Sequence, residues 1–270
     1  MNVDEIQRYL PGGMPLSVMK EGEYREVMPV LRKQGFEPVS PAWVMDVRNN
    51  AMGTEAEAAL WNTHVDTDFG VAADSEKVYL FPHSKLLREV TPATRLVDGG
   101  IPLQSTSDFE GKIEIPRSEF EGYLNKELSH KAFQDSPTRR LVWLPHLAGG
   151  NEERMKQYEE NAFASGKRDY NSNEMLGLFV PEDEKPIVRA LVLNGAYVQA
   201  DAYGWSLGGE GARLVGVRGV VAPEGRAPVS TSSSGSLDSR VEAYIAQHKL
   251  SAEDIQTALE TYVFLKQKIK

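Results

Sequence analysis

The chain has 270 residues, of which 41% are hydrophobic and 26% are charged, and this composition excludes wholesale disorder. Its formal net charge is -9 and its Lys and Arg residues are spread along the sequence, so a nucleic-acid partner is disfavoured. Cysteine is absent, which excludes disulfides, thiolate catalysis and cysteine-ligated zinc. The sequence starts without a signal peptide and has no apolar run near ~20 residues, so we expect a soluble, cytoplasmic protein with no membrane partner.

The first half of the chain mixes helix and strand signals. Tyr24, Val27, Met28 and Leu31 lie at helical spacing and predict a short helix. Apolar and β-branched runs predict strands at 42–48, 61–69, 77–81, 97–104 and 112–115. Ser118 and Glu121 form a capping box, which predicts that another helix begins there.

The middle of the chain predicts one clear helix. Residues 141–144 are apolar and are broken by Pro145, so they indicate a short strand or turn. Asn151 is a suitable N-cap for a helix that has Met155, Tyr158 and Ala162 on its inner side and ends at Gly166.

The strongest local pattern lies between residues 187 and 221. Residues 187–193 are typical of a strand, and Asn194 and Gly195 favour a two-residue type I′ turn. Strands are then expected at 196–206 and 212–221, with a glycine-rich turn between them. The sequence therefore predicts an α+β fold whose main domain, residues 1–222, contains a three-stranded antiparallel meander.

The end of the chain changes in composition. Residues 223–237 are rich in Ser, Pro and Gly and predict a flexible linker. Residues 238–270 predict a helical hairpin, which is too short to be stable alone and needs a partner surface. We therefore expect a protein partner or self-association through residues 238–270, with partner-binding residues Tyr244, Ile255, Leu259 and Tyr262.

A candidate metal site lies in the predicted strand 61–69. Side chains alternate between the faces of a strand, so His64, Asp66 and Asp68 share one face. One imidazole and two carboxylates suit a divalent cation such as Mg²⁺, Mn²⁺ or Zn²⁺, which could activate water. The alternative, which we favour, is the solvated face of a half-buried strand.

A candidate ligand-binding face lies in the predicted strand 196–206. Tyr203 and Trp205 share a face with Asp201, and such aromatic side chains can stack on a sugar ring or a base. The alternative is that the two aromatic residues belong to the core of the sheet, which is the commoner case.

Two histidines follow prolines, His83 after Pro82 and His146 after Pro145. Each could sit on a rigid loop near a cleft, but the expectation is an ordinary surface loop. The glycines at 208–211 precede a strand and not a helix, so turn formation explains them better than phosphate binding.

Three functions follow from these patterns. The first is a non-enzymatic interaction or assembly protein that uses residues 238–270 and needs no cofactor. The second is a metal-dependent hydrolase that uses His64, Asp66 and Asp68 and requires a divalent metal. The third is a binding module for a small ligand, a sugar or a nucleotide, that uses Tyr203, Trp205 and Asp201.

Overall fold

A computed structural model describes residues 17–105, 108, 111–196 and 199–217. The chain divides into two units, Met1–Gly225 and Arg226–Lys270, and every described residue lies in the first. The predicted helical hairpin and its residues Tyr244, Ile255, Leu259 and Tyr262 lie outside the described residues. No helix in the described part of the chain is long and apolar enough to cross a membrane.

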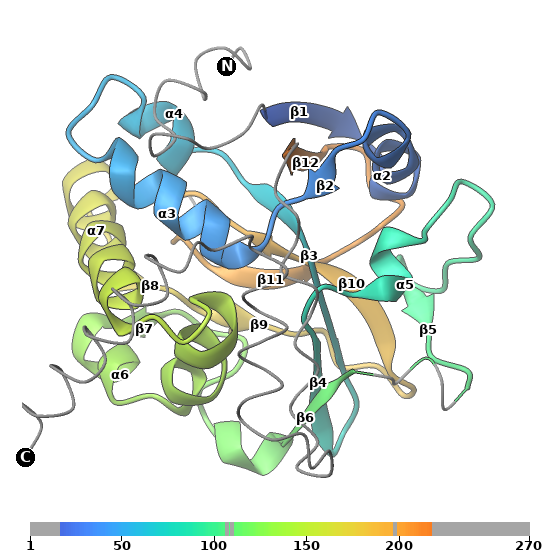
Figure 1. Cartoon of the computed structure of the whole chain (residues 1–270). Coiled ribbons are helices and arrows are strands. Elements are labelled where there is room, and N and C mark those ends of the chain that lie inside the picture. The colour runs from blue at the N-terminus through green and yellow to red at the C-terminus, as the bar shows by residue number, and fades with distance from the viewer. Residues whose placement is uncertain (1–16, 106–107, 109–110, 197–198, 218–270) are drawn as a thin grey trace, which may run out of the picture. The chain divides into compact units, whose positions relative to one another are not determined.

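A mixed sheet of ten strands forms the centre of the first unit (Figure 1). Its main path runs β1 (Ser17–Gly22), β12 (Ala212–Val217), β3 (Val65–Ala73), β10 (Ile187–Leu193), β11 (Ala202–Trp205) and β9 (Leu178–Phe179). The remaining strands are β2 (Glu37–Pro38), β4 (Lys77–Phe81), β5 (Ile101–Pro102) and β6 (Ile113–Pro116), which pair with β12, β3, β10 and β4 respectively. Most pairs are antiparallel, whereas β12–β3 and β11–β9 are parallel. A separate two-stranded sheet joins β7 (Leu128–Ser129) to β8 (Glu174–Met175).

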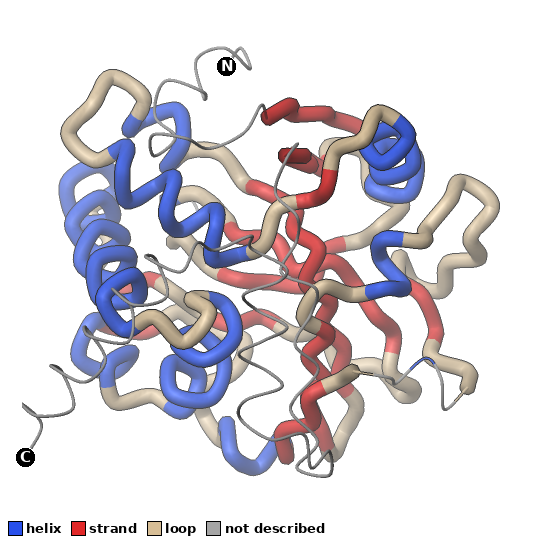
Figure 2. Tube along the Cα trace, viewed as in Figure 1, coloured by secondary structure: helices blue, strands red, loops and turns tan. Residues whose placement is uncertain are grey.

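Helices cover both faces of the large sheet, as the blue and red tubes of Figure 2 show. On one face, α2 (Tyr24–Lys33) and α5 (Lys85–Arg88) pack over a core that includes Met28, Leu31 and Leu87. On the other face lie α3 (Pro41–Ala51), α4 (Glu57–Trp61), α6 (His130–Gln134) and α7 (Glu152–Tyr170). A 3-10 helix η2 (Arg117–Phe120) and a π-helix η3 (Arg139–Leu147) complete the described elements.

The central strand β3 is buried along its whole length. Val71 and Ala73 pack into the core beneath α3 and α7, and Ala72 packs into the core beneath α2. Asp66 and Asp68 are only 1% and 3% exposed. The favoured interpretation of this strand as half-buried with a solvated face is therefore wrong, because helices occupy both of its sides.

The predicted fold class is wrong. β10 and β11 do form an antiparallel pair, but β12 does not continue a meander beside β11. Instead β12 lies between β1 and β3, with Ser17 opposite Val217 and Gly22 opposite Ala212. The observed architecture is a large mixed sheet with helices, because the last strand pairs with the first and with the buried β3.

The prediction of a two-residue turn at Asn194 and Gly195 is also wrong. The connection between β10 and β11 spans residues 194–201, and the described left-handed residues in it are Gln199 and Ala200, with φ of 57° and 52°. Asn194 is held instead by its contacts: its N–H donates to the carbonyl of Asp201 at 2.8 Å, and its carbonyl accepts from the guanidinium of Arg48 at 2.7 Å. These tertiary contacts override the local preference for a tight turn.

Several other elements can be compared with their predictions. The helix with Tyr24, the strand at 77–81 and the helix capped by Asn151 are confirmed. The strand predicted at 42–48 is instead α3, because Ser40 accepts a hydrogen bond from the N–H of Trp43 and Pro41 occupies the first turn. The helix predicted to begin at Ser118 is wrong: Ser118 lies inside the short η2, whose N-cap is Pro116 and which has no side-chain capping hydrogen bond.

Candidate functional site

An aromatic pair stands on one face of β11. The rings of Tyr203 and Trp205 meet edge to face, with centroids 5.2 Å apart and an interplanar angle of 89°. Trp205 is 38% exposed, whereas the chain's other three tryptophans are buried or half-buried. Edge-to-face packing is a favourable arrangement of two aromatic quadrupoles, so the pair forms a defined apolar surface that water can reach.

The backbone that carries this pair is fixed on both sides. Trp205 lies opposite Ala190 of β10, and Tyr203 lies opposite both Val192 of β10 and Phe179 of β9. On the reverse face, a Cβ added at Gly204 would lie 3.0 Å from Cγ1 of Val71. The small side of β11 therefore packs closely on the sheet, whereas the ring of Trp205 on the other side reaches the surface.

The turn after β11 is held by a second hairpin. Residues 97–100 close on themselves through a bridge between Val97 and Gly100. The N–H of Leu207 donates to the carbonyl of Gly99 at 2.7 Å, and a Cβ at Gly99 would lie 2.4 Å from Oγ of Ser206. Because Gly99 also has a φ of +79°, a side chain there would be strained and would push Ser206 away.

Asp201 does not share the exposed face with the aromatic pair. Its carboxylate is 5% exposed and accepts a hydrogen bond from the N–H of Gly177 at 2.6 Å. Burial raises the pKa of Asp201 to about 8, against the opposing effect of the Gly177 hydrogen bond. Asp201 therefore joins the 194–201 connection to the chain before β9.

The three residues of the predicted metal site contact three different partners. His64 Nε2 lies 2.8 Å from the carbonyl of Gly211, and Asp66 accepts from the N–H of Arg213 at 2.6 Å. Asp68 Oδ2 lies 2.7 Å from Nδ1 of His83. Desolvation lowers the pKa of His64 and raises the pKa of Asp66 to about 6.

Within the described ranges, no group of three or more His, Asp or Glu side chains is placed to hold a metal ion. The metal-dependent hydrolase stays a prediction that this geometry does not strengthen. His83, which the sequence presented as an ordinary loop residue, is the histidine that contacts one of these carboxylates. The sequence signal for a fixed position of His83 was the preceding Pro82. The contact of His83 with Asp68 could not be predicted, because no local pattern connects the two positions.

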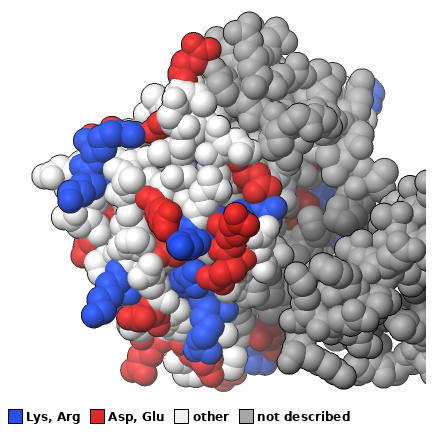
Figure 3. Space-filling model, turned by 60° about the vertical axis from the view of Figure 1, so that its left-hand side comes forward, with Lys and Arg blue, Asp and Glu red and all other residues white. Residues whose placement is uncertain are grey.

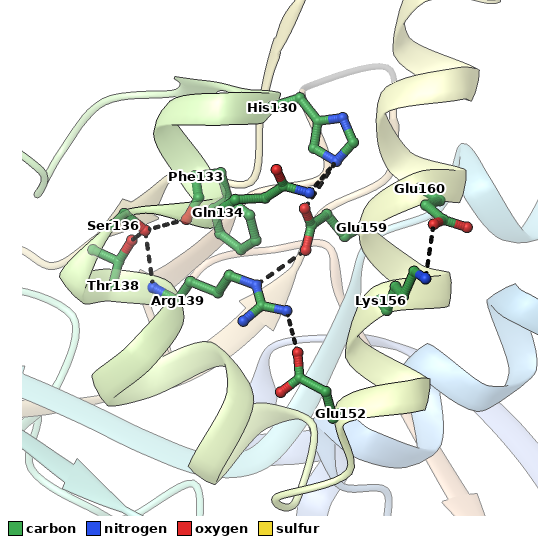
Figure 4. Close-up of polar contacts among 10 residues, drawn as sticks. All are labelled: His130, Phe133, Gln134, Ser136, Thr138, Arg139, Glu152, Lys156, Glu159 and Glu160. Carbon is green, nitrogen blue, oxygen red and sulfur yellow. Dashed lines mark hydrogen bonds and ion pairs between the residues drawn. The ribbon is translucent and has the colours of Figure 1, made fainter.

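A further polar cluster joins α6, η3 and α7 around the buried Glu159 (Figure 4). Glu159 is 1% exposed and accepts from Nε of Arg139 at 3.0 Å. His130 Nε2 lies at ion-pair distance, 2.8 Å, from the other oxygen of Glu159, and the ring of His130 stacks on Phe163 with centroids 4.5 Å apart. Arg139 also binds the exposed Glu152 at 2.6 Å. Each oxygen of the buried Glu159 carboxylate therefore has a basic side chain beside it, and the cluster joins the three elements as a structural clamp.

Figure 3 brings forward the side of the unit that carries α7, and there the basic and acidic side chains alternate. Lys156 and Glu160 are one such exposed pair, with Nζ and Oε1 3.9 Å apart. Among the described residues on this face, no patch of one sign is seen of the kind that a nucleic-acid backbone requires.

Comparisons with known proteins bear on the fold. No protein-family model matches the sequence, and a search of the curated proteins finds no significant match. A solved structure from work on the accommodation of massive sequence variation in Nanoarchaeota by the C-type lectin fold is similar, with a TM-score of 0.56. The match covers 77% of this chain and 99% of that chain at 15% sequence identity. At this identity the likeness shows the fold alone, so the described unit has a fold similar to that of C-type lectins.

Proposed function

We propose that this protein is a non-enzymatic binding module that takes its ligand on the face of β11 that carries Tyr203 and Trp205. The observation that carries the proposal is the edge-to-face pair of the half-buried Tyr203 and the exposed Trp205, on a strand that is hydrogen-bonded on both sides. The similarity to a C-type lectin fold agrees with a binding module, and it adds nothing about the ligand.

The chemistry of the aromatic pair selects the ligand class. Trp205 offers a large apolar ring with one N–H donor, and the adjacent Tyr203 offers a ring with a hydroxyl group. Flat apolar faces that are edged with polar groups are found on sugar rings and on nucleobases, and stacking on such faces contributes about 1–3 kcal/mol per base. We therefore expect a sugar or nucleotide ligand, and the buried Asp201 would act only by holding the adjacent connection in place.

The test is a tryptophan fluorescence titration of the full-length protein with a panel of methyl glycosides and nucleoside monophosphates. The proposal expects a saturable change with at least one compound, and expects that Trp205→Ala removes both the change and the binding measured by calorimetry. Tyr170→Ala is the matched control, because Tyr170 is 39% exposed and lies at the end of α7, away from β11 in the chain. A flat response across the panel, or equal binding by Trp205→Ala, would remove the proposal.

The assembly role of residues 238–270 rests only on its sequence argument, because those residues lie outside the described ranges. Size-exclusion chromatography with light scattering, on the full chain and on a chain that ends at residue 222, tests it. If residues 238–270 drive assembly, truncation lowers the mass of the particle by more than the mass of the residues removed. An unchanged number of copies per particle argues against the assembly role.

A further inference from the structure

A second feature of the described unit is a histidine that is clamped to a buried carboxylate. Nδ1 of His83 lies 2.7 Å from Oδ2 of Asp68, and the next backbone N–H, that of Ser84, donates to the carbonyl of Asp68 at 2.8 Å. His83 has a φ of 49°, a left-handed conformation that is costly for a residue with a side chain. Two hydrogen bonds to Asp68 thus hold His83 in a backbone conformation that it would not adopt alone.

This clamp fixes which ring edge faces outward. The Asp68 side chain is 5% exposed and the His83 side chain is 39% exposed, so the carboxylate lies inside and the imidazole reaches the surface. With Nδ1 engaged by Asp68, Nε2 is the ring nitrogen left for a ligand. The hydrogen bond to the Asp68 carboxylate raises the pKa of His83, and burial and the nearby Arg88 oppose this effect. Asp68 therefore favours the imidazolium, whose Nε2–H is a hydrogen-bond donor.

His83 lines a cleft of about 520 Å³, a size within the range of small-ligand sites. Phe81 and Leu86 supply its apolar lining, and Lys85, Glu89 and Asp108 supply charge. Within the described residues, no ion pair involves Lys85 or Glu89. Asp108 accepts from the N–H groups of Gln104 and Ser105, both at 2.8 Å, which fixes the position of its carboxylate.

The charges of this lining decide between ligand classes. A simple anion would meet His83 and Lys85 favourably but would be repelled by Glu89 and Asp108. A simple cation would be attracted by Glu89 and Asp108 but repelled by His83 and Lys85. A metal ion would require three or more ligating side chains together, which the described residues do not supply. A ligand that carries both a negative and a positive group can place the first beside His83 and Lys85 and the second beside Glu89 and Asp108.

We infer that the cleft beside His83 binds a small zwitterion with an apolar side chain, such as an α-amino acid, with its carboxylate on Nε2 of His83 and its ammonium group toward Glu89. Lys85 adds a second cation for the carboxylate, and Phe81 and Leu86 contact the apolar side chain. Asp68 is a positioning residue in this site, because it reaches the ligand only through His83. The inference uses β4 and α5 and does not depend on the aromatic pair of β11.

The test is calorimetry and ¹H–¹³C NMR of the His83 ring on the full-length protein, titrated with L-leucine. L-phenylalanine is a second probe. Two analogues that each lack one charge are 4-methylpentanoate, without the ammonium group, and 3-methylbutylamine, without the carboxylate. The inference expects a saturable shift of the His83 resonance with an amino acid, and at least tenfold weaker binding of both analogues. No saturable shift with either amino acid would overturn the inference, and equal binding of 4-methylpentanoate would replace it with a simple anion site.

Variants separate binding from folding. His83→Gln is expected to abolish binding and Asp68→Asn to weaken it at least tenfold, but both can destabilise the strained loop. Lys85→Ala and Glu89→Gln change exposed side chains, and each is expected to weaken binding at least fivefold in a folded protein. Glu160→Gln is the matched control, because the Glu160 side chain is 58% exposed and lies on α7. Unchanged binding in both Lys85→Ala and Glu89→Gln would overturn the assignment of the charges.

Discussion

Arg48 is a buried cation whose hydrogen-bond partners are neutral. It is 1% exposed, and its guanidinium donates to the hydroxyl of Tyr158 and to the carbonyls of Leu60, Thr63, Leu193 and Asn194. These partners belong to α7, α4, the end of β10 and the connections beside them. One side chain therefore holds three elements together.

Replacing Arg48 with Met keeps the apolar volume but removes all the donors. Four carbonyls then lose a partner, and the hydrogen bonds to three of them, those of Leu60, Leu193 and Asn194, are buried. Each buried loss costs about 1–3 kcal/mol, because water cannot replace the donor. We expect Arg48→Met to lower the free energy of unfolding by at least about 3 kcal/mol in urea denaturation. Lys156→Met is the control, because the Lys156 side chain is 70% exposed. A loss below about 1 kcal/mol for Arg48→Met would contradict the assigned role.

Asp201 makes the stability of the protein depend on pH. Its pKa is raised by burial to about 8, above the ordinary value of 3.8 that it has in the unfolded chain. Between these values the folded state holds a proton that the unfolded state has lost, so stability falls as pH rises, by about 1.4 kcal/mol per pH unit. The contribution is complete below pH 3.8 and is lost once the pH passes about 8.

Asp201→Asn imitates the protonated side chain and still accepts from Gly177. We expect the variant to lose less stability than the wild type between pH 5.5 and pH 8, measured as urea midpoints at a series of pH values. Parallel pH profiles for the two proteins would show that Asp201 titrates normally.

At the residue scale, sequence predicts faces better than it predicts burial. The alternation in 196–206 predicts Tyr203 and Trp205 on one side, as observed, because period two is a local property of any strand. It also predicts Asp201 on that side, and this is wrong because β11 begins only at Ala202. The same alternation failed for Asp66 and Asp68, whose burial depends on α2 and on segments far away in the chain. The contact between Asp68 and His83 was equally inaccessible, because no spacing rule links strand 65–73 to the loop after β4.

At the scale of elements, the polar cluster in Figure 4 offers two substitutions, Arg139→Ala and Glu152→Ala, that remove a buried and a solvated ion pair of Arg139. The Glu159 side chain is 2% exposed and the Glu152 side chain is 62% exposed, and both bind Arg139. Arg139→Ala leaves the buried Glu159 with only His130 and is expected to cost about 3 kcal/mol. Glu152→Ala removes a solvated pair and is expected to cost under about 1 kcal/mol. Thermal and urea unfolding measure both, and equal costs would show that the buried charge is not the source of the stability.

Elements with strong local signals were predictable. The helix α7 has Asn151 as its N-cap, acidic residues in its first turn and an inner apolar stripe, and it was located correctly apart from its last turn. Residues 42–48 predict a strand, because they are apolar without clear helical spacing, whereas the structure has the helix α3 there. Its capping by Ser40 and the burial of Arg48 against distant carbonyls decide the outcome. Local pattern therefore fails where long-range contacts decide which face is buried.

At the scale of the whole unit, the pairing of β1 with β12 is the feature that sequence could not predict, because nearly two hundred residues separate the strands. Glu21 lies opposite Arg213 in this pair, and their side chains form an ion pair of 2.7 Å. The chain has no cysteine of its own, so an introduced pair reports this contact without background.

Glu21→Cys combined with Arg213→Cys is expected to form a disulfide under mild oxidation. The Cβ atoms of directly opposite residues lie about 4.5–5.5 Å apart, and a small backbone shift brings them to the distance of about 3.5–4.5 Å that a disulfide spans. Non-reducing electrophoresis measures the cross-link. Lys20→Cys combined with Arg213→Cys is the control, since the side chain of residue 20 points to the other face of β1. Efficient cross-linking of the control but not of the test pair would place β1 in a different register.

The most direct test of the proposed binding face is hydrogen–deuterium exchange of the full-length protein, with and without the best ligand from the fluorescence panel. The account predicts slower exchange in the peptides that cover residues 199–211, and no such change in Trp205→Ala. Protection confined to residues 81–89, or to residues 238–270, would contradict the aromatic face and would move the binding function to the cleft beside His83 or to the end of the chain.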